Sequence, residues 1–353
     1  MKIVNKIFKK SKILTLDNYL DEVLYNKQHG YYSKKNPFGT KGDYVTAPNI
    51  SNLFCEMIVI WFVSFWENLN KPKEINFIEL GPGNGDLCLV FLKTLKNFPE
   101  AYNSTNIMLY EKSEKLKKIQ KNRINSKKVS WINDLNLIKK NPVIFFGNEF
   151  LDALPIKQFK KTDKNIFEKY VNLKKNKINF VFRKALKTQI NKLKNYKLLK
   201  SSGIIEYPEF GFKELEIVCK KIKELNGGAL FIDYGYNWSK NTDTLQSIKK
   251  HKFNNINKNI GNADITSLVN FSLYKKYFIS KDLFVENVLS QGEFLQKMGI
   301  IERINMVSNK MNLYNKSNLY SRVNRLIDPR MMGENFKVIF AKNKKCKFSL
   351  AFR

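Results

Sequence analysis

Histidine, cysteine and arginine are all scarce in this chain of 353 residues. Its two histidines, His29 and His251, are too few for a histidine-based zinc site or a Ser-His-Asp triad. The four cysteines lie far apart and form no CxxC pair, which indicates reduced, buried thiols rather than a disulfide framework. We therefore expect no metal site.

Long apolar runs are also absent. The longest, Leu53 to Trp66, contains Glu56 and falls short of the roughly 20 residues that a membrane span needs. The lysine-rich segment 1–16 has no arginine, no compact apolar core and no small-residue cleavage site. We expect neither a secretory signal nor a transit peptide there, and hence a cytoplasmic protein in a bacterium.

The formal net charge of +32 raises the question of nucleic-acid binding. Of the 63 basic residues, however, only seven are arginine. Recognition of phosphates and bases favours the bidentate fork of arginine. Lysine, asparagine and isoleucine are abundant together, which is typical of an AT-rich genome. We interpret the charge as a solvated lysine surface and expect no nucleic-acid partner.

From residue 75 onward, short apolar strands alternate with helical patterns, which predicts an α/β fold with a parallel sheet. We expect a class I, Rossmann-like domain over residues 71–353, preceded by an N-terminal cap over 1–70. Two insertions, at about 156–185 and 260–326, interrupt the alternation as a hairpin and as several helices. The expected strands are Ile75 to Leu80, Asn106 to Tyr110, Val129 to Ile132, Val143 to Phe146, Gly228 to Ile232 and Lys337 to Ala341.

The first of these strands leads directly into a glycine-rich loop. Its sequence places Glu79 at the strand end and then Gly81, Pro82, Gly83 and Gly85 before a helix. Glycines let the backbone turn tightly and approach a ligand. The dinucleotide fingerprint would need glycine where Asp86 stands, and a pyrophosphate would be repelled by Glu79, whereas a sulfonium would be attracted. The loop therefore predicts S-adenosylmethionine (SAM) as the cofactor.

Acidic residues follow the next two strands. Glu111 ends the second strand, where a carboxylate can accept hydrogen bonds from both ribose hydroxyls. Asp134, after the third strand, is equally consistent with an acceptor for the adenine amino group and with a helix N-cap. We also expect Gly42 and Thr46, in an ordered loop of the cap, to contact the cofactor as that loop closes and excludes water.

Three polar residues follow the fourth strand, at the position that faces the transferred methyl group in this fold. Asn148, Glu149 and Asp152 lie within about one turn of each other. If the acceptor is arginine, its cationic guanidinium needs compensating carboxylates beside a sulfonium. We therefore expect these three residues to be catalytic, with Glu149 and Asp152 orienting the guanidinium. Alternatively, Asp152 caps a helix and Glu149 is solvated.

Taken together, these motifs resemble the MidA-like family of SAM-dependent methyltransferases. The resemblance implies symmetric dimethylation of an arginine in a subunit of respiratory complex I, assisting its assembly, and a mitochondrial matrix location if the source is eukaryotic. Asn49, Cys55 and Asn84 depart from the pattern. The matching segments are Gly30-Tyr31-Tyr32, Thr46-Ala47-Pro48, Glu79 to Gly83, Asn148 to Pro155, Asp233-Tyr234-Gly235, Thr244-Leu245-Gln246, Ala263 to Thr266, Gln291-Gly292 and Met332-Gly333.

Two other functions are consistent with the sequence. The charge would suit an RNA methyltransferase, whose affinity would fall steeply with salt. A non-catalytic assembly chaperone could keep the fold, although it would be free to lose Glu79 and Glu149. A protein substrate is the partner that the resemblance implies, and a homodimer is possible.

Overall fold

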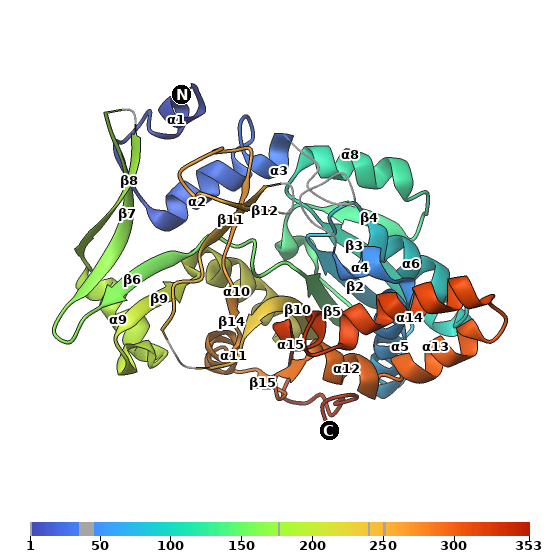
Figure 1. The fold of residues 1–353 in the computed structure, drawn as a ribbon. Helices are drawn as coiled ribbons and strands as arrows, with labels where there is room; N and C mark the ends of the chain where they lie inside the picture. Colours follow the sequence, from blue (N-terminus) through green and yellow to red (C-terminus); the bar gives the residue numbers. More distant parts are fainter. Residues whose placement is uncertain (1, 35–45, 176, 239–240, 250–251) are drawn as a thin grey trace.

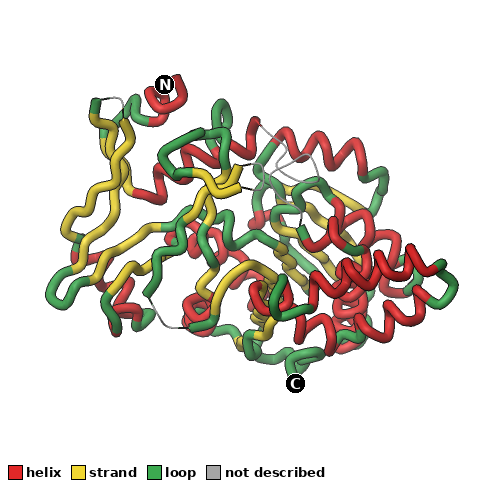
Figure 2. Tube along the Cα trace, in the orientation of Figure 1, coloured by secondary structure: helices red, strands yellow, loops and turns green. Residues whose placement is uncertain are grey.

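The centre of the molecule is a nine-stranded sheet with helices on both faces (Figures 1 and 2). The structure is a computed structural model that describes residues 2–34, 46–175, 177–238, 241–249 and 252–353. In the central sheet, the strands pair in the order β15-β17-β10-β5-β2-β3-β4; they are parallel from β10 to β4, and β17 pairs antiparallel with β10. The strands are β2 (Ile75–Leu80), β3 (Thr105–Tyr110), β4 (Val129–Ile132), β5 (Val143–Asn148), β10 (Gly228–Tyr236), β14 (Val269–Asn270), β15 (Phe284–Val285), β16 (Leu289–Ser290) and β17 (Phe336–Lys342).

Each strand that the sequence predicts is present, and the α/β prediction is confirmed. The reason is burial on both faces, which makes such strands continuous apolar runs: every residue of β2 is buried. One face is covered by α5 (Asn52–Asn68) and α6 (Asp86–Leu95), whose aromatic rings pack against those of the sheet. The Phe77 and Phe91 rings stack with centroids 4.0 Å apart, and Phe62 meets Phe77 edge-on at 5.2 Å.

The helices fall into two layers around the sheet. The first layer is α5 (Asn52–Asn68), α6 (Asp86–Leu95), α7 (Pro99–Ser104), α12 (Gln291–Lys297), α13 (Ile300–Ser308), α14 (Leu313–Ile327) and α15 (Met332–Asn335). The second is η1 (Leu135–Leu137), α9 (Lys187–Asn195), η2 (Leu198–Lys200), α10 (Glu209–Glu224) and α11 (Phe271–Ser280). Helix α8 (Glu114–Arg123) follows β3. No helix in these described ranges is long and apolar enough to cross a membrane.

A second sheet joins the expected cap to the expected hairpin. Its strands are β1 (Ile13–Thr15), β6 (Lys157–Lys161), β7 (Ile166–Lys174), β8 (Lys177–Lys184) and β9 (Gly203–Tyr207). The pairing of β7 with β8 confirms the hairpin, and β1 adds to the other edge of β7. Helices α1 (Lys2–Ile7) and α2 (Leu16–Tyr25) lie beside this sheet. Helix α3 (Tyr31–Lys34) contacts α2 and α8, and α4 (Ala47–Ile50) packs against α5, α6 and α14. The boundary near residue 70 stays a prediction, since α5 packs with the central sheet.

The segment 260–326, predicted as a helical insertion, contains short strands as well as helices. Its helices are α11 to α14, and its strands include β13 (Asp264–Thr266), which pairs with β11 (Gln246–Lys249). A further strand, β12 (Lys252–Asn254), completes that small sheet. Strands of two or three residues are too short to show a period of two in a sequence.

A buried lysine connects the N-terminal segment to the second sheet. The Nζ atom of Lys157 lies 2.8 Å from Glu168 Oε1, 3.2 Å from Asp17 Oδ1 and 3.8 Å from Glu209 Oε2. These partners come from β7, α2 and α10, and Asp17 and Glu168 are each 2% exposed. Burial disfavours the ammonium, yet these carboxylates raise the pKa of Lys157 overall.

Replacing this lysine should destabilise the fold strongly. Lys157→Met leaves the carboxylates of Asp17 and Glu168 buried without a cation, which typically costs about 3–5 kcal/mol. The measurement is the free energy of unfolding in urea. The control is Lys164→Met, at an exposed position before β7, which should change that free energy by less than about 0.5 kcal/mol. Equal unfolding midpoints for the two variants would show that the ion pairs of Lys157 contribute nothing to the stability of the fold.

Candidate cofactor and methyl-transfer site

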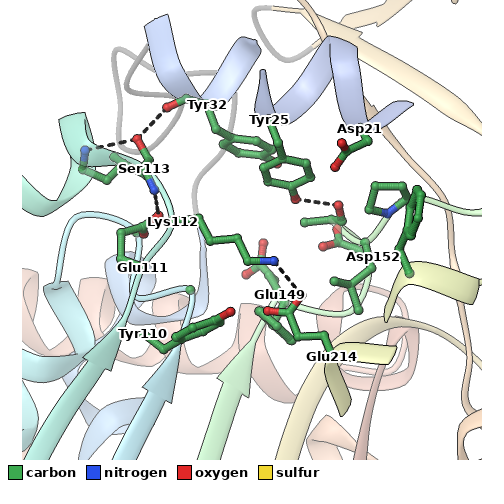
Figure 3. A pocket seen from close by; sticks show the side chains of 18 of the residues that line it. Asp21, Tyr25, Tyr32, Tyr110, Glu111, Lys112, Ser113, Glu149, Asp152 and Glu214 are labelled. Carbon is green, nitrogen blue, oxygen red and sulfur yellow. Dashed lines mark hydrogen bonds and ion pairs between the residues drawn. The ribbon is translucent and has the colours of Figure 1, made fainter. Parts of the chain in front are cut away.

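The carboxyl ends of β2, β3, β5 and β10 meet at one edge of the central sheet, under helices α2 and α3 (Figure 3). Each strand carries an acidic residue at or near this end: Glu79 lies one residue before the end of β2, Glu111 and Glu149 directly follow β3 and β5, and Asp233 lies near the end of the pairing of β10 with β17. Ligands bind at this edge in open α/β sheets because the loops there are free of the sheet's hydrogen bonding. A cavity and a smaller adjoining hollow open at this edge, and both are lined by Gly81, Gly83 and Glu149.

The glycine loop turns through three left-handed residues before α6 begins at Asp86. Gly81, Gly83 and Gly85 have φ angles of 66°, 55° and 79°, a region that other residues adopt only with strain. A Cβ on Gly81 would also lie 3.2 Å from the Phe150 ring. The Gly85 amide donates to the Pro82 carbonyl at 2.8 Å, which closes the turn. The loop therefore needs glycine at these positions to take this shape.

Glu79 is the residue beside the loop whose surroundings most clearly favour a cationic ligand. Its side chain is 5% exposed, and Oε2 has no hydrogen-bond partner within the described residues. Burial, and then the nearby Asp86 and Glu111, raise its pKa well above the ordinary value. A buried carboxylate with no cation is unfavourable, so a positively charged ligand at the loop would fit this group. The residues thus fit the cationic methionine end of SAM.

Glu111 is held in place by a buried glutamine that sequence reasoning missed. Its Oε1 accepts from the Ser113 amide at 2.7 Å, and its Oε2 accepts from Gln120 Nε2 at 3.3 Å. Gln120 Nε2 also donates to the Gly83 carbonyl at 2.8 Å, which links the acid to the loop. Gln120 follows Leu116 by one helical turn, and that shared face was the available signal. Burial raises the pKa of Glu111 to about 7.

The other predicted cofactor residues lie in different settings. Thr46 lines the smaller hollow together with Glu79, Pro82 and Asn148. Asp134 is exposed, caps η1 by accepting from the Asn136 amide at 2.8 Å, and is not among the residues that line either space. Of its two possible roles, the structure shows the helix cap. Gly42 lies outside the described residues.

Asn148 and Glu149 stand side by side where β5 ends. Glu149 has a φ of 51°, and its amide donates to the Ile232 carbonyl of β10 at 2.9 Å. Asn148 Nδ2 donates to Glu149 Oε1 at 3.1 Å, while Asn148 Oδ1 is buried without a partner in the described residues. The surrounding protein desolvates the Glu149 carboxylate, and Asp152 adds repulsion, which together raise its pKa to about 8.

Asp233, which we expected only as a family motif, shapes the turn that carries Asp152. Fully buried, it accepts from the amides of Leu151 at 2.7 Å, Asp152 at 3.3 Å and Tyr234 at 2.8 Å. Burial, then Asp233 and Asp264, raise the pKa of Asp152 well above its ordinary value. Burial and the nearby Glu149 raise that of Asp233 to about 8. Its place directly after the expected strand Gly228 to Ile232 was a usable signal.

The cavity is acidic, although the chain as a whole is strongly basic. Among the described residues that line it, the cation is Lys112, which pairs with Glu214 at 2.6 Å (Figure 3). The acids that line it are Asp21, Glu111, Glu149, Asp152, Glu214 and Asp264. Within the described ranges, no group of three or more histidine, cysteine, aspartate or glutamate side chains is arranged to hold a metal ion. The arrangement favours a cationic ligand near Glu149 and Asp152.

Gly83→Val should abolish SAM binding while the fold survives. The left-handed φ costs an L-residue about 1–2 kcal/mol, and the side chain would enter the ligand's space. Gly299→Val is the matched control, since Gly299 has a φ of 84° at the start of α13 and is not among the lining residues. In urea unfolding, we expect the two variants to lose similar amounts of stability. In calorimetry, we expect only the control to bind SAM. Normal binding by Gly83→Val would mean that the loop does not hold the cofactor.

SAM affinity should depend on the ionisation of Glu111. Because its pKa is raised to about 7 in the free protein, the carboxyl is largely neutral below that pH and cannot accept from two hydroxyls. Protonation of Glu111 should therefore contribute a loss of up to roughly tenfold in the association constant per pH unit below about 7. Calorimetric titration from pH 5.5 to 8.5 measures this. Glu111→Gln should bind more weakly and lose this step, and a step that persists in the variant would belong to another group.

The comparisons with known proteins agree with this geometry. Residues 57–286 match the family model described as "Putative S-adenosyl-L-methionine-dependent methyltransferase". The chain is similar to protein arginine methyltransferase NDUFAF7, mitochondrial, from Homo sapiens, with 28% identity over 357 residues, 92% of this chain and 78% of that protein. The Xenopus tropicalis protein of that name is 28% identical over 321 residues, 81% of this chain and 72% of its own length.

A solved structure confirms the fold. A Burkholderia thailandensis protein, crystallised with S-adenosyl-homocysteine, superposes with a TM-score of 0.85 at 23% identity, covering 99% of this chain and 92% of that one. At this identity the likeness concerns the fold alone. The family model, in contrast, spans well over half of the chain and includes the glycine loop, Glu111, Glu149 and Asp152. The chain therefore belongs to the family of S-adenosyl-L-methionine-dependent methyltransferases.

Proposed function

We propose that this methyltransferase transfers the methyl group to an arginine of a protein substrate. The observation that carries the proposal is the pair Glu149 and Asp152, set on an acidic cavity that shares Gly81 and Gly83 with the cofactor hollow. A guanidinium is a planar cation with five donors, and two carboxylates can hold it in one plane. The similar mitochondrial proteins named as protein arginine methyltransferases support the same acceptor.

The residues of the loop and of β3 would hold the cofactor. Glu79 would lie near its positive methionine end, Gly81, Pro82, Gly83 and Gly85 would let the backbone approach, and Glu111 would accept from the ribose. Bound SAM supplies a methyl group activated by a positively charged sulfur. Thr46 would close the space from the side of α4. Asp134 remains outside this set.

The acids after β5 would position the acceptor and receive its proton. Asn148 fixes Glu149 through the 3.1 Å hydrogen bond, and Asp233 fixes the turn that carries Asp152. The acceptor nitrogen must lose a proton as it gains a methyl group. A carboxyl whose pKa is raised to about 8 in the free protein is basic enough to take that proton near neutral pH. Entry of the guanidinium would first ionise it by attraction.

The finer assignment follows from the resemblance to the MidA-like family. We propose symmetric dimethylation of an arginine in a subunit of respiratory complex I, as a step that assists assembly. The protein would act in the cytoplasm of a bacterium, or in the mitochondrial matrix of a eukaryote. Mass spectrometry of a complex I subunit pool incubated with enzyme and SAM tests this. Methylation confined to other proteins would remove the complex I assignment and leave the arginine acceptor standing.

Glu149→Gln should keep SAM binding and lose most methyl transfer. The amide preserves the shape but not the charge that offsets the guanidinium, and loss of one such contact costs about 3 kcal/mol, or roughly a hundredfold in rate. Asp152→Asn should behave similarly if the two acids act together. The assay is transfer of labelled methyl to a protein substrate, with cofactor affinity measured in parallel.

Stability gives an independent readout for the same variant. Because the folded-state pKa of Glu149 is raised, ionising it at high pH destabilises the native state, and Gln removes that penalty. Glu149→Gln should therefore unfold at no lower temperature than the natural protein at pH 8.5. Glu67→Gln, at an exposed position of α5, is the control for charge alone. Full activity in Glu149→Gln would show that the acceptor is not a cation held by this carboxylate.

A further inference from the structure

A basic hollow opens where α14 packs against α4, close to the cofactor site (Figure 1). Its charged residues are Arg322 and Arg325, which are exposed and lie one turn apart on α14. Side chains three residues apart share one face of a helix. The rest of its lining is uncharged: Asn49, Ile50, Ser321, Asn324 and Met331.

These two arginines are available for a ligand. Three other arginines pair with carboxylates, namely Arg123 with Asp86, Arg303 with Glu56 and Arg330 with Asp328. No ion pair or side-chain hydrogen bond involves Arg322 or Arg325 within the described part of the chain. Arginine is rare in a chain that uses lysine for most of its positive charge. Two neighbouring guanidinium groups are suited to bidentate binding of a carboxylate.

Helix α4 separates the hollow from the cofactor site, and one of its residues lines both. Asn49 lines both spaces, donates to Asp86 Oδ2 at 2.8 Å, and accepts from Thr46 Oγ1 at 3.2 Å. On the same four-residue helix, the Ala47 backbone hydrogen-bonds to the Glu149 carboxyl. A helix of this length spans roughly 6 Å. Helix α4 thus contacts the Glu149 carboxyl through Ala47 and lines the basic hollow through Asn49 and Ile50, so a peptide with its arginine at Glu149 would pass over α4 on its way to Arg322 and Arg325.

We propose that Arg322 and Arg325 bind an acidic side chain of the protein substrate, close in sequence to the arginine that is methylated. The inference rests on the proposed arginine acceptor. An extended chain advances about 3.3 Å per residue, so the acid should lie roughly two to four residues from the target. The acidic cavity and the basic hollow together recognise a pair of opposite charges. This pattern favours an arginine with a nearby aspartate or glutamate over a purely basic segment.

The test uses the full-length protein and a set of peptides with one arginine and one glutamate at spacings from one to five residues, on either side. In each matched peptide, glutamine replaces the glutamate. We expect a KM about fivefold lower for the glutamate peptide at the best spacing. The double variant Arg322→Gln/Arg325→Gln should lose this difference and keep its kcat. The double variant Lys118→Gln/Lys310→Gln, which removes two exposed charges elsewhere, should retain it.

Two outcomes would overturn the inference. One is equal KM for glutamate and glutamine peptides at every spacing in the natural protein, and the other is unchanged preference in the arginine variant. If no arginine peptide is methylated although SAM binds, the proposed function has failed instead. Peptide affinity for the protein loaded with S-adenosyl-homocysteine, measured by fluorescence anisotropy, then decides whether Arg322 and Arg325 bind the acid. Equal affinity of both peptides would reject that binding.

Discussion

Several acidic side chains lie close together at the edge of the central sheet where its parallel strands end, with little positive charge beside them. Glu79, Glu149, Asp152 and Asp233 all have raised pKa values, and burial is the largest cause in each case. In the free protein, each of these carboxyl groups therefore stays protonated or, when it ionises, destabilises the folded state. The free-energy cost of ionising them falls when a cation binds nearby. This edge of the sheet therefore favours positively charged ligands. The cofactor and the proposed acceptor both have that sign.

The rest of the fold supplies the rigidity that this edge requires. Stacked phenylalanines hold β2 and β5 against α5 and α6, with Phe77 and Phe146 centroids 6.1 Å apart. Backbone amides pin Asp233, and Gln120 joins the glycine loop to Glu111. Exposed lysines are spread over the outer surface, although a few lysines, such as Lys157, are buried in ion pairs. The lysine-rich exterior thus surrounds an acidic interior, so the net charge says little about the ligand.

Much of this could be predicted from the sequence because the signals were local. Apolar runs gave the buried strands, and the spacing of Gly81, Gly83 and Gly85 predicted a loop that only glycine allows. Glu111 and Glu149 followed from their places at strand ends. The role of Asp134 could not be decided, because a helix-capping aspartate and a cofactor-binding aspartate can have the same local sequence. Gln120, Asp264 and the two-residue strands depend on contacts between distant segments, which one sequence does not reveal.

The most direct test of this account is the number of protons released on ligand binding. Calorimetry in buffers of different ionisation enthalpy measures it for SAM and for S-adenosyl-homocysteine, which lacks the positive sulfur. At pH 6.5, carboxyl groups with raised pKa values, such as Glu149, are largely protonated. Binding of the SAM cation should ionise them, so the protein should release more protons on binding SAM than on binding S-adenosyl-homocysteine. Proton release that is equal for the two ligands would contradict the claim that this edge is prepared for positive charge.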